Sequence, residues 1–142
     1  MHPRRAPTNR HRSTSTVMKT YAQTIELRAD GVEEYVRLHA AVWPEILSSL
    51  RSVGVLQMKI WTSGRRAFMY METTDAFDPD VDFPRHMAMS EKCVEWGALT
   101  RTFQSPVEEA KEGEWWCRME ECFDMRAQLS AREEDASRAP VT

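Results

Sequence analysis

The alternation of hydrophobic and polar residues predicts both strands and helices between residues 18 and 126. In the segment 20–28, aromatic and aliphatic residues alternate with polar neighbours, a period typical of a half-buried strand. Between residues 32 and 51 the apolar residues instead recur every three or four positions, as they do on one face of a helix. Asp30, in the turn before this helix, is a candidate N-cap.

The rest of this region continues the same alternation of element types. Residues 53–61 and 67–72 are rich in strand-forming residues, and a turn containing Gly64 joins them, which predicts a hairpin. The segment 75–84 contains two prolines and four aspartates and is predicted to be a loop. The two remaining predicted elements are a helix, 85–103, and a short strand, 115–123.

The predicted order of elements, β-α-β-β-α-β, is that of an α+β domain with a ferredoxin-like fold. In this arrangement two helices cover one face of an antiparallel sheet. The other face also needs a cover, because a sheet covered on one side only leaves apolar residues exposed. A homodimer packed sheet to sheet, as in a dimeric α/β barrel, would supply that cover.

The composition excludes several classes of protein. The 142 residues allow one domain with its own core, and a formal net charge of −3 argues against a nucleic-acid-binding face. No apolar run approaches the roughly 20 residues that cross a bilayer. The three cysteines, Cys93, Cys117 and Cys122, lack a CxxC spacing and indicate a reducing compartment. We therefore expect a cytoplasmic protein without membrane or nucleic-acid partners.

The two terminal segments differ in composition from the region between them. Residues 1–17 contain four arginines, no acidic residue and almost nothing apolar, which predicts a disordered basic tail. The same composition fits an organellar transit peptide, and a natural start at Met18 would make the segment an upstream extension. Residues 127–142 are polar and predict a second disordered tail, which leaves 18–126 as the folded domain.

The first predicted helix brings three chemically distinctive side chains onto one stripe. Tyr35, His39 and Trp43 occupy positions i, i+4 and i+8, and His39 falls near the middle of the apolar face. A titratable group directed at a core costs free energy unless it has a partner or a use. His39 is therefore either a neutral core histidine with a hydrogen-bond partner or a general acid/base at the inner end of a pocket.

Other candidate sites have weaker support from the spacing. His86 and Cys93 could join His39 as metal ligands, but no paired-ligand spacing supports a metal site. The sequence contains no glycine-rich phosphate loop and no nucleophile-elbow motif. Three tryptophans are either core residues or stacking platforms for the apolar face of a sugar: Trp96, Trp115 and Trp116.

The segment 34–45, EYVRLHAAVWPE, resembles the helix signature EYxxxHxxxWPE of the L-rhamnose mutarotase family. The resemblance continues through residues 58–61 (MKIW), 68–72 (FMYME) and 114–123 (EWWCRMEECF), and it spans essentially all of 18–126. It implies a ferredoxin-like fold, a homodimer and a small-molecule monosaccharide as substrate. The implied reaction interconverts the α and β anomers of a 6-deoxy-L-sugar.

The resemblance also implies roles for individual residues. His39 matches the catalytic histidine of the family, described as a proton donor, and Tyr35 matches a tyrosine that contacts the substrate. Trp96 matches the first of two tryptophans near the sugar. Two residues depart from the rhamnose pattern, because Met58 replaces a sugar-contacting tyrosine and Gly97 replaces the second tryptophan. Some relatives with the Met-Lys-Ile-Trp strand act on L-fucose, so the resemblance leaves L-rhamnose and L-fucose as alternative substrates.

Opening and closing a pyranose changes only C–O and O–H bonds, so we expect no cofactor and no metal for this reaction. A second class of function shares the same architecture. Dimeric ferredoxin-like domains also serve as cofactor-free monooxygenases, haem-binding proteins and small-ligand sensors, which the fold alone does not separate. The helix signature favours the mutarotase over these alternatives.

Overall fold

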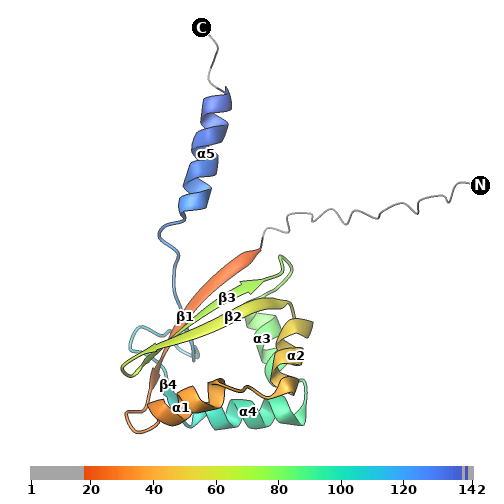
Figure 1. The fold of residues 1–142 in the computed structure, drawn as a ribbon, viewed down its shortest axis with the longest axis vertical. Coiled ribbons are helices and arrows are strands. Elements are labelled where there is room, and N and C mark those ends of the chain that lie inside the picture. Colours follow the sequence, from red (N-terminus) through yellow and green to blue (C-terminus); the bar gives the residue numbers. More distant parts are fainter. Residues whose placement is uncertain (1–17, 139, 141–142) are drawn as a thin grey trace, which may run out of the picture.

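The computed structural model describes residues 18–138 and 140. At its centre is an antiparallel sheet with the strand order β2-β3-β1-β4, and β5 pairs with β1. Figure 1 shows the three long strands side by side above a layer of helices. The strands are β1 (Lys19–Leu27), β2 (Val55–Ser63), β3 (Arg66–Thr73), β4 (Gln104–Ser105) and β5 (Cys117–Arg118).

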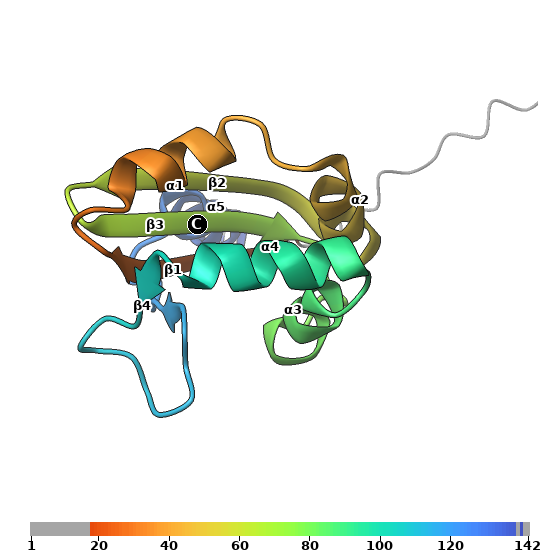
Figure 2. The same cartoon turned by 90° about the horizontal axis from the view of Figure 1, so that it is seen from below.

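The helices between residues 32 and 101 lie on one face of this sheet, and the last helix points away from the body (Figure 1), as the view from below in Figure 2 also shows. The sheet order and the one-sided helical layer confirm the predicted α+β ferredoxin-like fold. The helices are α1 (Val32–His39), α2 (Pro44–Ser52), α3 (Pro79–Met87), α4 (Glu91–Arg101) and α5 (Met125–Arg138).

The prediction of one helix over 32–51 is wrong, because the chain forms two helices there. Pro44 explains the break. The ring of a proline clashes with a helical conformation of the preceding residue, and Trp43 accordingly takes φ −57° and ψ 137°. Pro44 then occupies the first turn of α2, where its missing N–H costs nothing. Trp43 therefore does not continue the helical stripe of Tyr35 and His39.

The second predicted helix, 85–103, is also divided, and the predicted loop 75–84 is partly helical. Helix α3 begins at Pro79, and the Asp78 side chain caps it by accepting a hydrogen bond from the Asp80 amide at 3.0 Å. Ser90 caps α4 in the same way, accepting from the Cys93 amide. The caps at Asp78 and Ser90, twelve positions apart, define two helices where the apolar period alone suggested one.

The C-terminal part differs from the prediction in two ways. The strand predicted over 115–123 is reduced to the two residues of β5, and α5 forms where a disordered tail is predicted from residue 127. No residue of α5 is buried, so the helix rests on its local sequence and not on a core. The predicted basic tail, 1–17, lies outside the described residues. No helix in the described part of the chain is both long and apolar enough to span a bilayer.

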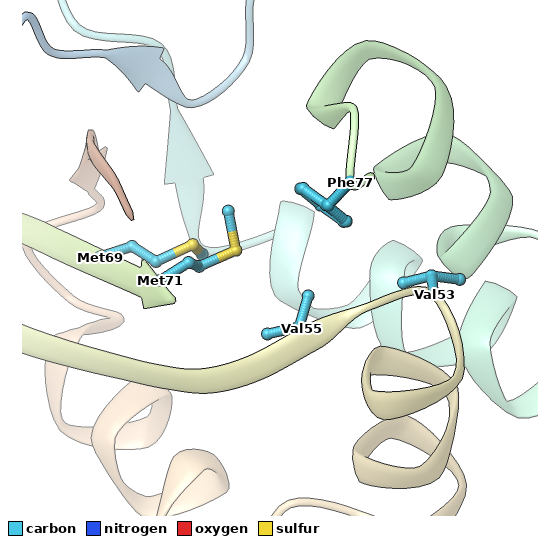
Figure 3. Close-up of a cluster of buried hydrophobic side chains, with 5 residues drawn as sticks. All are labelled: Val53, Val55, Met69, Met71 and Phe77. Atoms are coloured by element: carbon cyan, nitrogen blue, oxygen red, sulfur yellow. The ribbon is translucent and has the colours of Figure 1, made fainter. Parts of the chain in front are cut away.

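The main core lies where the end of α2 and the start of α3 meet the sheet. Figure 3 shows its five buried side chains converging from β2, β3 and the connections beside them. Phe77 is 2% exposed and contacts Tyr21 edge to face, with 5.9 Å between ring centroids. The other members are Val53, Val55, Met69 and Met71.

The opposite face of the sheet presents aromatic side chains to the surface. Trp61 of β2 is 52% exposed, and its ring lies 6.3 Å from that of Phe68, its partner on β3. Tyr70, two residues further along β3, is half-buried and donates a hydrogen bond to Glu72. In Figure 1 and Figure 2 helices α1 to α4 all lie on the other side of the sheet.

Phe77→Ala is expected to lower the free energy of unfolding by about 3–5 kcal/mol, because it removes a fully buried ring and leaves a cavity. Urea denaturation followed by circular dichroism measures this change. Val81→Ala, at a position of α3 that is 60% exposed, is the control and should change the free energy of unfolding by less than about 0.5 kcal/mol. Equal effects of the two substitutions would contradict the assignment of this core.

Candidate active site

A cavity of about 1570 Å³ opens between the sheet and the helical layer. Helices α1 to α4 line one side, strands β1 to β4 line the other, and residues of the segment 109–118 complete the lining. The cavity brings together three residues that the sequence singled out: Tyr35, His39 and Trp96. Its wall also contains the two positions that depart from the rhamnose pattern, Met58 and Gly97.

His39 is the last residue of α1 and is half-buried in the cavity wall. Its Nδ1 atom lies 2.7 Å from the backbone oxygen of Tyr35. A carbonyl oxygen can only accept a hydrogen bond, so Nδ1 bears the proton and Nε2 of the neutral ring has a free lone pair. Burial lowers the pKa of His39, against the opposing effect of this hydrogen bond, so the neutral form predominates near pH 7.

Aromatic rings hold the imidazole of His39 from two sides. The Tyr35 ring lies 4.2 Å from it, centroid to centroid, and the Trp96 ring meets it edge to face at 5.3 Å. Trp43 reaches the same group in spite of the helix break, because its ring lies 5.1 Å from that of Trp96. The aromatic cluster expected from the helical stripe therefore exists, but the loop between α1 and α2 positions its outer member.

Tyr35 is 1% exposed and its hydroxyl group is part of a buried hydrogen-bond chain. Gln104 donates from Nε2 to the Tyr35 hydroxyl at 3.0 Å, and Trp115 donates from Nε1 to Gln104 Oε1 at 2.8 Å. Burial raises the pKa of Tyr35 to about 12, and the hydrogen bond from Gln104 offsets part of that rise. The phenol is therefore protonated throughout the physiological pH range.

Gln104 is the residue of this site that the sequence analysis missed. A single glutamine after a helix has no spacing that marks it, and its partners lie 69 and 11 residues away along the chain. The sequence predicts Trp115 to be either a core residue or a stacking platform. In the structure it donates to Gln104, and the Arg101 guanidinium lies 4.9 Å from its ring centroid.

The departure at Gly97 has a structural counterpart on α3. Gly97 is buried in α4, and a Cβ atom added to it would overlap the end of the Met87 side chain. The space of a larger residue at this position is thus occupied by Met87, which also lines the cavity. Met58, on β2, is half-buried and packs beside the main core. Two flexible thioether side chains therefore line the wall where the rhamnose pattern has aromatic residues.

His86 is buried beside Ser49, with 2.7 Å between its Nδ1 and the serine Oγ, and its ring packs edge to face on Phe83. Burial lowers the pKa of His86. Cys93 belongs instead to a core cluster with Ile46 and Trp96. Among residues 18–138 and 140 no three His, Cys, Asp or Glu side chains are close enough to hold a metal ion.

Comparison with known proteins identifies relatives across the whole folded region. Residues 20–125 match the family model described as L-rhamnose mutarotase. A UPF0734 protein of Dictyostelium discoideum is 38% identical over 112 residues, which cover 75% of this chain and 90% of that protein. An L-fucose mutarotase of Xanthomonas campestris is 27% identical over 124 residues, 84% of this chain and 98% of the relative.

A solved structure supports the fold independently of close sequence similarity. The L-rhamnose mutarotase of Formosa agariphila superposes with a TM-score of 0.57 at 17% identity. The match covers 75% of this chain and 98% of that one. The common architecture therefore extends over nearly the whole length of the neighbour.

His39 is expected to titrate below its ordinary pKa of 6.5, because burial disfavours the imidazolium. Two-bond ¹H–¹⁵N NMR spectra recorded across a pH series report both this pKa and the tautomer, and His39→Gln assigns the signals. We expect the neutral ring to be protonated on Nδ1, so that a basic Nε2 persists until the pH falls below the lowered pKa. A neutral ring protonated on Nε2 would contradict the geometry at Tyr35.

Proposed function

The chain belongs to the L-rhamnose mutarotase family, and we propose that it interconverts the α and β anomers of a 6-deoxy-L-hexose, either L-rhamnose or L-fucose. The observation that supports this most directly is the unprotonated Nε2 of His39 at the wall of an aromatic-lined cavity. Because burial lowers the pKa of His39 below its ordinary value, the neutral imidazole is present to accept a proton at physiological pH. Tyr35 and Trp96 contribute the walls that orient the sugar.

In the proposed mechanism His39 acts first as a base and then as an acid. Nε2 takes the proton of the anomeric hydroxyl, the bond between C1 and the ring oxygen breaks, and a second acid, a side chain or a water molecule, gives a proton to the ring oxygen. The aldehyde rotates about C1–C2, the ring oxygen attacks its other face and returns its proton to the conjugate base of that acid, and the imidazolium returns its proton to the anomeric oxygen. His39 is thus also the proton donor of the closing step. One positioned acid/base accelerates such a reaction by about 10²–10⁴-fold.

The choice between the two sugars depends on the part of the cavity that departs from the rhamnose pattern. L-Rhamnose and L-fucose differ in the configuration of their C2 and C4 hydroxyl groups. Met58 and Met87 line the wall where aromatic side chains would otherwise lie, and methionine adapts its shape more readily than an aromatic ring. The curated relatives include proteins named for each sugar, so both are tested below.

We further propose that the protein is a homodimer that uses the exposed face of the sheet. Trp61 and Phe68 form an apolar patch on that face, opposite the helices. Burying such a patch against its copy in a second subunit is favourable in proportion to the apolar area removed from water. The cavity opens on the opposite, helical side of the sheet, so dimerisation leaves it accessible.

His39→Ala should reduce the enzymatic exchange rate by about 10²–10⁴-fold, because it removes the acid/base. The domain should stay folded, because the side chain is only half-buried. Saturation-transfer NMR on the anomeric protons of L-rhamnose and of L-fucose measures the rate for each sugar. Val36→Ala, at an exposed position of the same helix, serves as the matched control.

Acceleration of one sugar or both by the wild-type protein supports the mutarotase function and identifies the substrate. Wild-type exchange rates in a folded His39→Ala protein would contradict the role of His39. If the folded wild-type protein accelerates neither sugar, the mutarotase proposal fails, and absorption spectra with haem and oxygen-uptake assays would test the binding and monooxygenase alternatives.

Trp61→Glu is expected to convert the homodimer into a monomer, because it places a charge in the centre of the apolar patch. Size-exclusion chromatography with light scattering measures the mass directly. Val81→Glu adds the same charge at an exposed apolar position of α3, on the helical side, and should leave the mass unchanged. A wild-type protein that is monomeric at high concentration would overturn this part of the proposal.

A further inference from the structure

The buried hydrogen-bond chain from Trp115 through Gln104 to Tyr35 has a direction that its chemistry fixes. The indole N–H of Trp115 can only donate, so the Gln104 atom 2.8 Å from it must be the amide oxygen. The amide nitrogen of Gln104 therefore faces Tyr35, and it donates to the hydroxyl oxygen at 3.0 Å. The side-chain orientation of the glutamine thus follows from its partner and needs no further assumption.

This direction determines what the Tyr35 hydroxyl can do. Its oxygen already accepts a hydrogen bond from Gln104, and its own hydrogen has no acceptor among the described residues. Tyr35 lines the cavity together with Gln104 and Trp115. The phenolic O–H is consequently available as a hydrogen-bond donor to a molecule bound in the cavity.

The neighbouring imidazole has the opposite polarity. The Tyr35 carbonyl accepts from His39 Nδ1 at 2.7 Å, so Nε2 of His39 is an acceptor. The two rings lie 4.2 Å apart, centroid to centroid. One donor and one acceptor, each fixed by a backbone or side-chain partner, therefore belong to two rings that pack together in the wall of the same cavity.

We infer that Tyr35 is the proton donor to the ring oxygen of the sugar, and that Gln104, anchored by Trp115, is the positioning residue that gives Tyr35 this role. The inference rests on the proposed mutarotase function and completes its acid/base pair. Tyr35 also has a structural role, because its hydroxyl group is the acceptor for the buried Gln104 amide.

Every proton in the resulting step is accounted for. On ring opening, the electron pair of the C1–O bond moves to the ring oxygen, which takes the phenolic proton of Tyr35, while His39 Nε2 takes the proton of the anomeric hydroxyl. On closure, the ring oxygen attacks C1 and returns its proton to the Tyr35 phenolate, and the imidazolium protonates the former carbonyl oxygen. The phenolate and the imidazolium formed between these steps stabilise each other as adjacent opposite charges.

Gln104 contributes to this step in two ways. Its N–H stabilises the phenolate more than the phenol, which makes Tyr35 a stronger acid than burial alone would allow. It also occupies one lone pair of the Tyr35 hydroxyl, which leaves the O–H free to point towards the sugar. Gln104 is buried, and its position in β4, paired with Leu27 of β1, fixes it relative to α1.

The sharpest test reverses the hydrogen bond between residue 104 and the Tyr35 hydroxyl with a side chain of nearly the same shape. In Gln104→Glu the carboxylate still accepts from Trp115, but it also accepts the Tyr35 proton, which is then no longer available to the sugar. We expect kcat for anomer exchange at about pH 8 to fall by about 10²–10⁴-fold, as in Tyr35→Phe. Lowering the pH towards 6.5 should restore part of the rate, because the protonated carboxyl group can again donate to Tyr35.

A pair of further variants separates positioning from folding. Gln104→Leu should lower kcat roughly tenfold in the wild-type background and have no further effect in Tyr35→Phe. Trp115→Phe should likewise lower kcat in the wild-type background and have no further effect on kcat in Gln104→Leu. Thr24→Val is the control. It removes the hydrogen bond from a buried threonine of β1 to the Ala67 carbonyl, which is not part of the Trp115–Gln104–Tyr35 series, and it should leave kcat unchanged.

The outcomes distinguish this inference from the proposed function. If the wild-type protein is active and Gln104→Glu retains its rate at pH 8, the role of the chain is overturned while the mutarotase function stands. Equal losses from Gln104→Leu with and without the Tyr35 hydroxyl would also overturn it, because the glutamine would then act on stability alone. Inactivity of the wild-type protein towards both sugars would instead refute the function itself.

Discussion

The conformational restriction that Pro44 imposes on Trp43 divides the helical layer beside the cavity into α1 and α2. Because Trp43 cannot be helical, residues 32–52 cannot form one continuous helix; α1 ends at His39 and α2 begins at Pro44. The break places the imidazole at a helix end, facing the cavity, and directs the Trp43 ring to the edge of Trp96. A continuous helix over the same residues would carry Trp43 along the stripe of Tyr35 and His39, two turns beyond the tyrosine. The contact between Trp43 and Trp96 thus depends on one proline, whereas Tyr35 and Trp96 contact His39 directly.

The order of strands and helices could be predicted because each long element has a clear period and a turn residue at its end. The helix boundaries could not be predicted in this way, because the apolar periodicity continues past a proline or a capping serine at which one helix gives way to another. Pro44 and Ser90 are visible in the sequence, and the effect of each on the preceding residues is the signal that would have corrected the two long helices. The prediction of a loop over 75–84 failed for a different reason: aspartates and prolines are typical of loops, whereas here Asp78 and Pro79 begin α3.

The candidate site was predictable only in part. Tyr35 and His39 lie one turn apart on a single helix, so their spacing alone indicated that they share a face. Gln104, by contrast, lies in strand β4, and the Met87 side chain of α3 fills the space beside Gly97 of α4. Such contacts depend on how distant segments pack, and no pattern within either segment encodes them. The tautomer of His39 likewise depends on a backbone oxygen, which every residue possesses.

The placement of Tyr35 and His39 on the same short helix has a mechanical consequence. Residues four apart in a helix are separated by a rise of about 6 Å along its axis, and the backbone hydrogen bonds of the helix maintain that rise. Slow movements of the helical layer against the sheet would change the width of the cavity but carry both side chains together. The alignment of this pair should therefore tolerate breathing of the domain and moderate warming, conditions under which groups on separate elements would lose their mutual geometry.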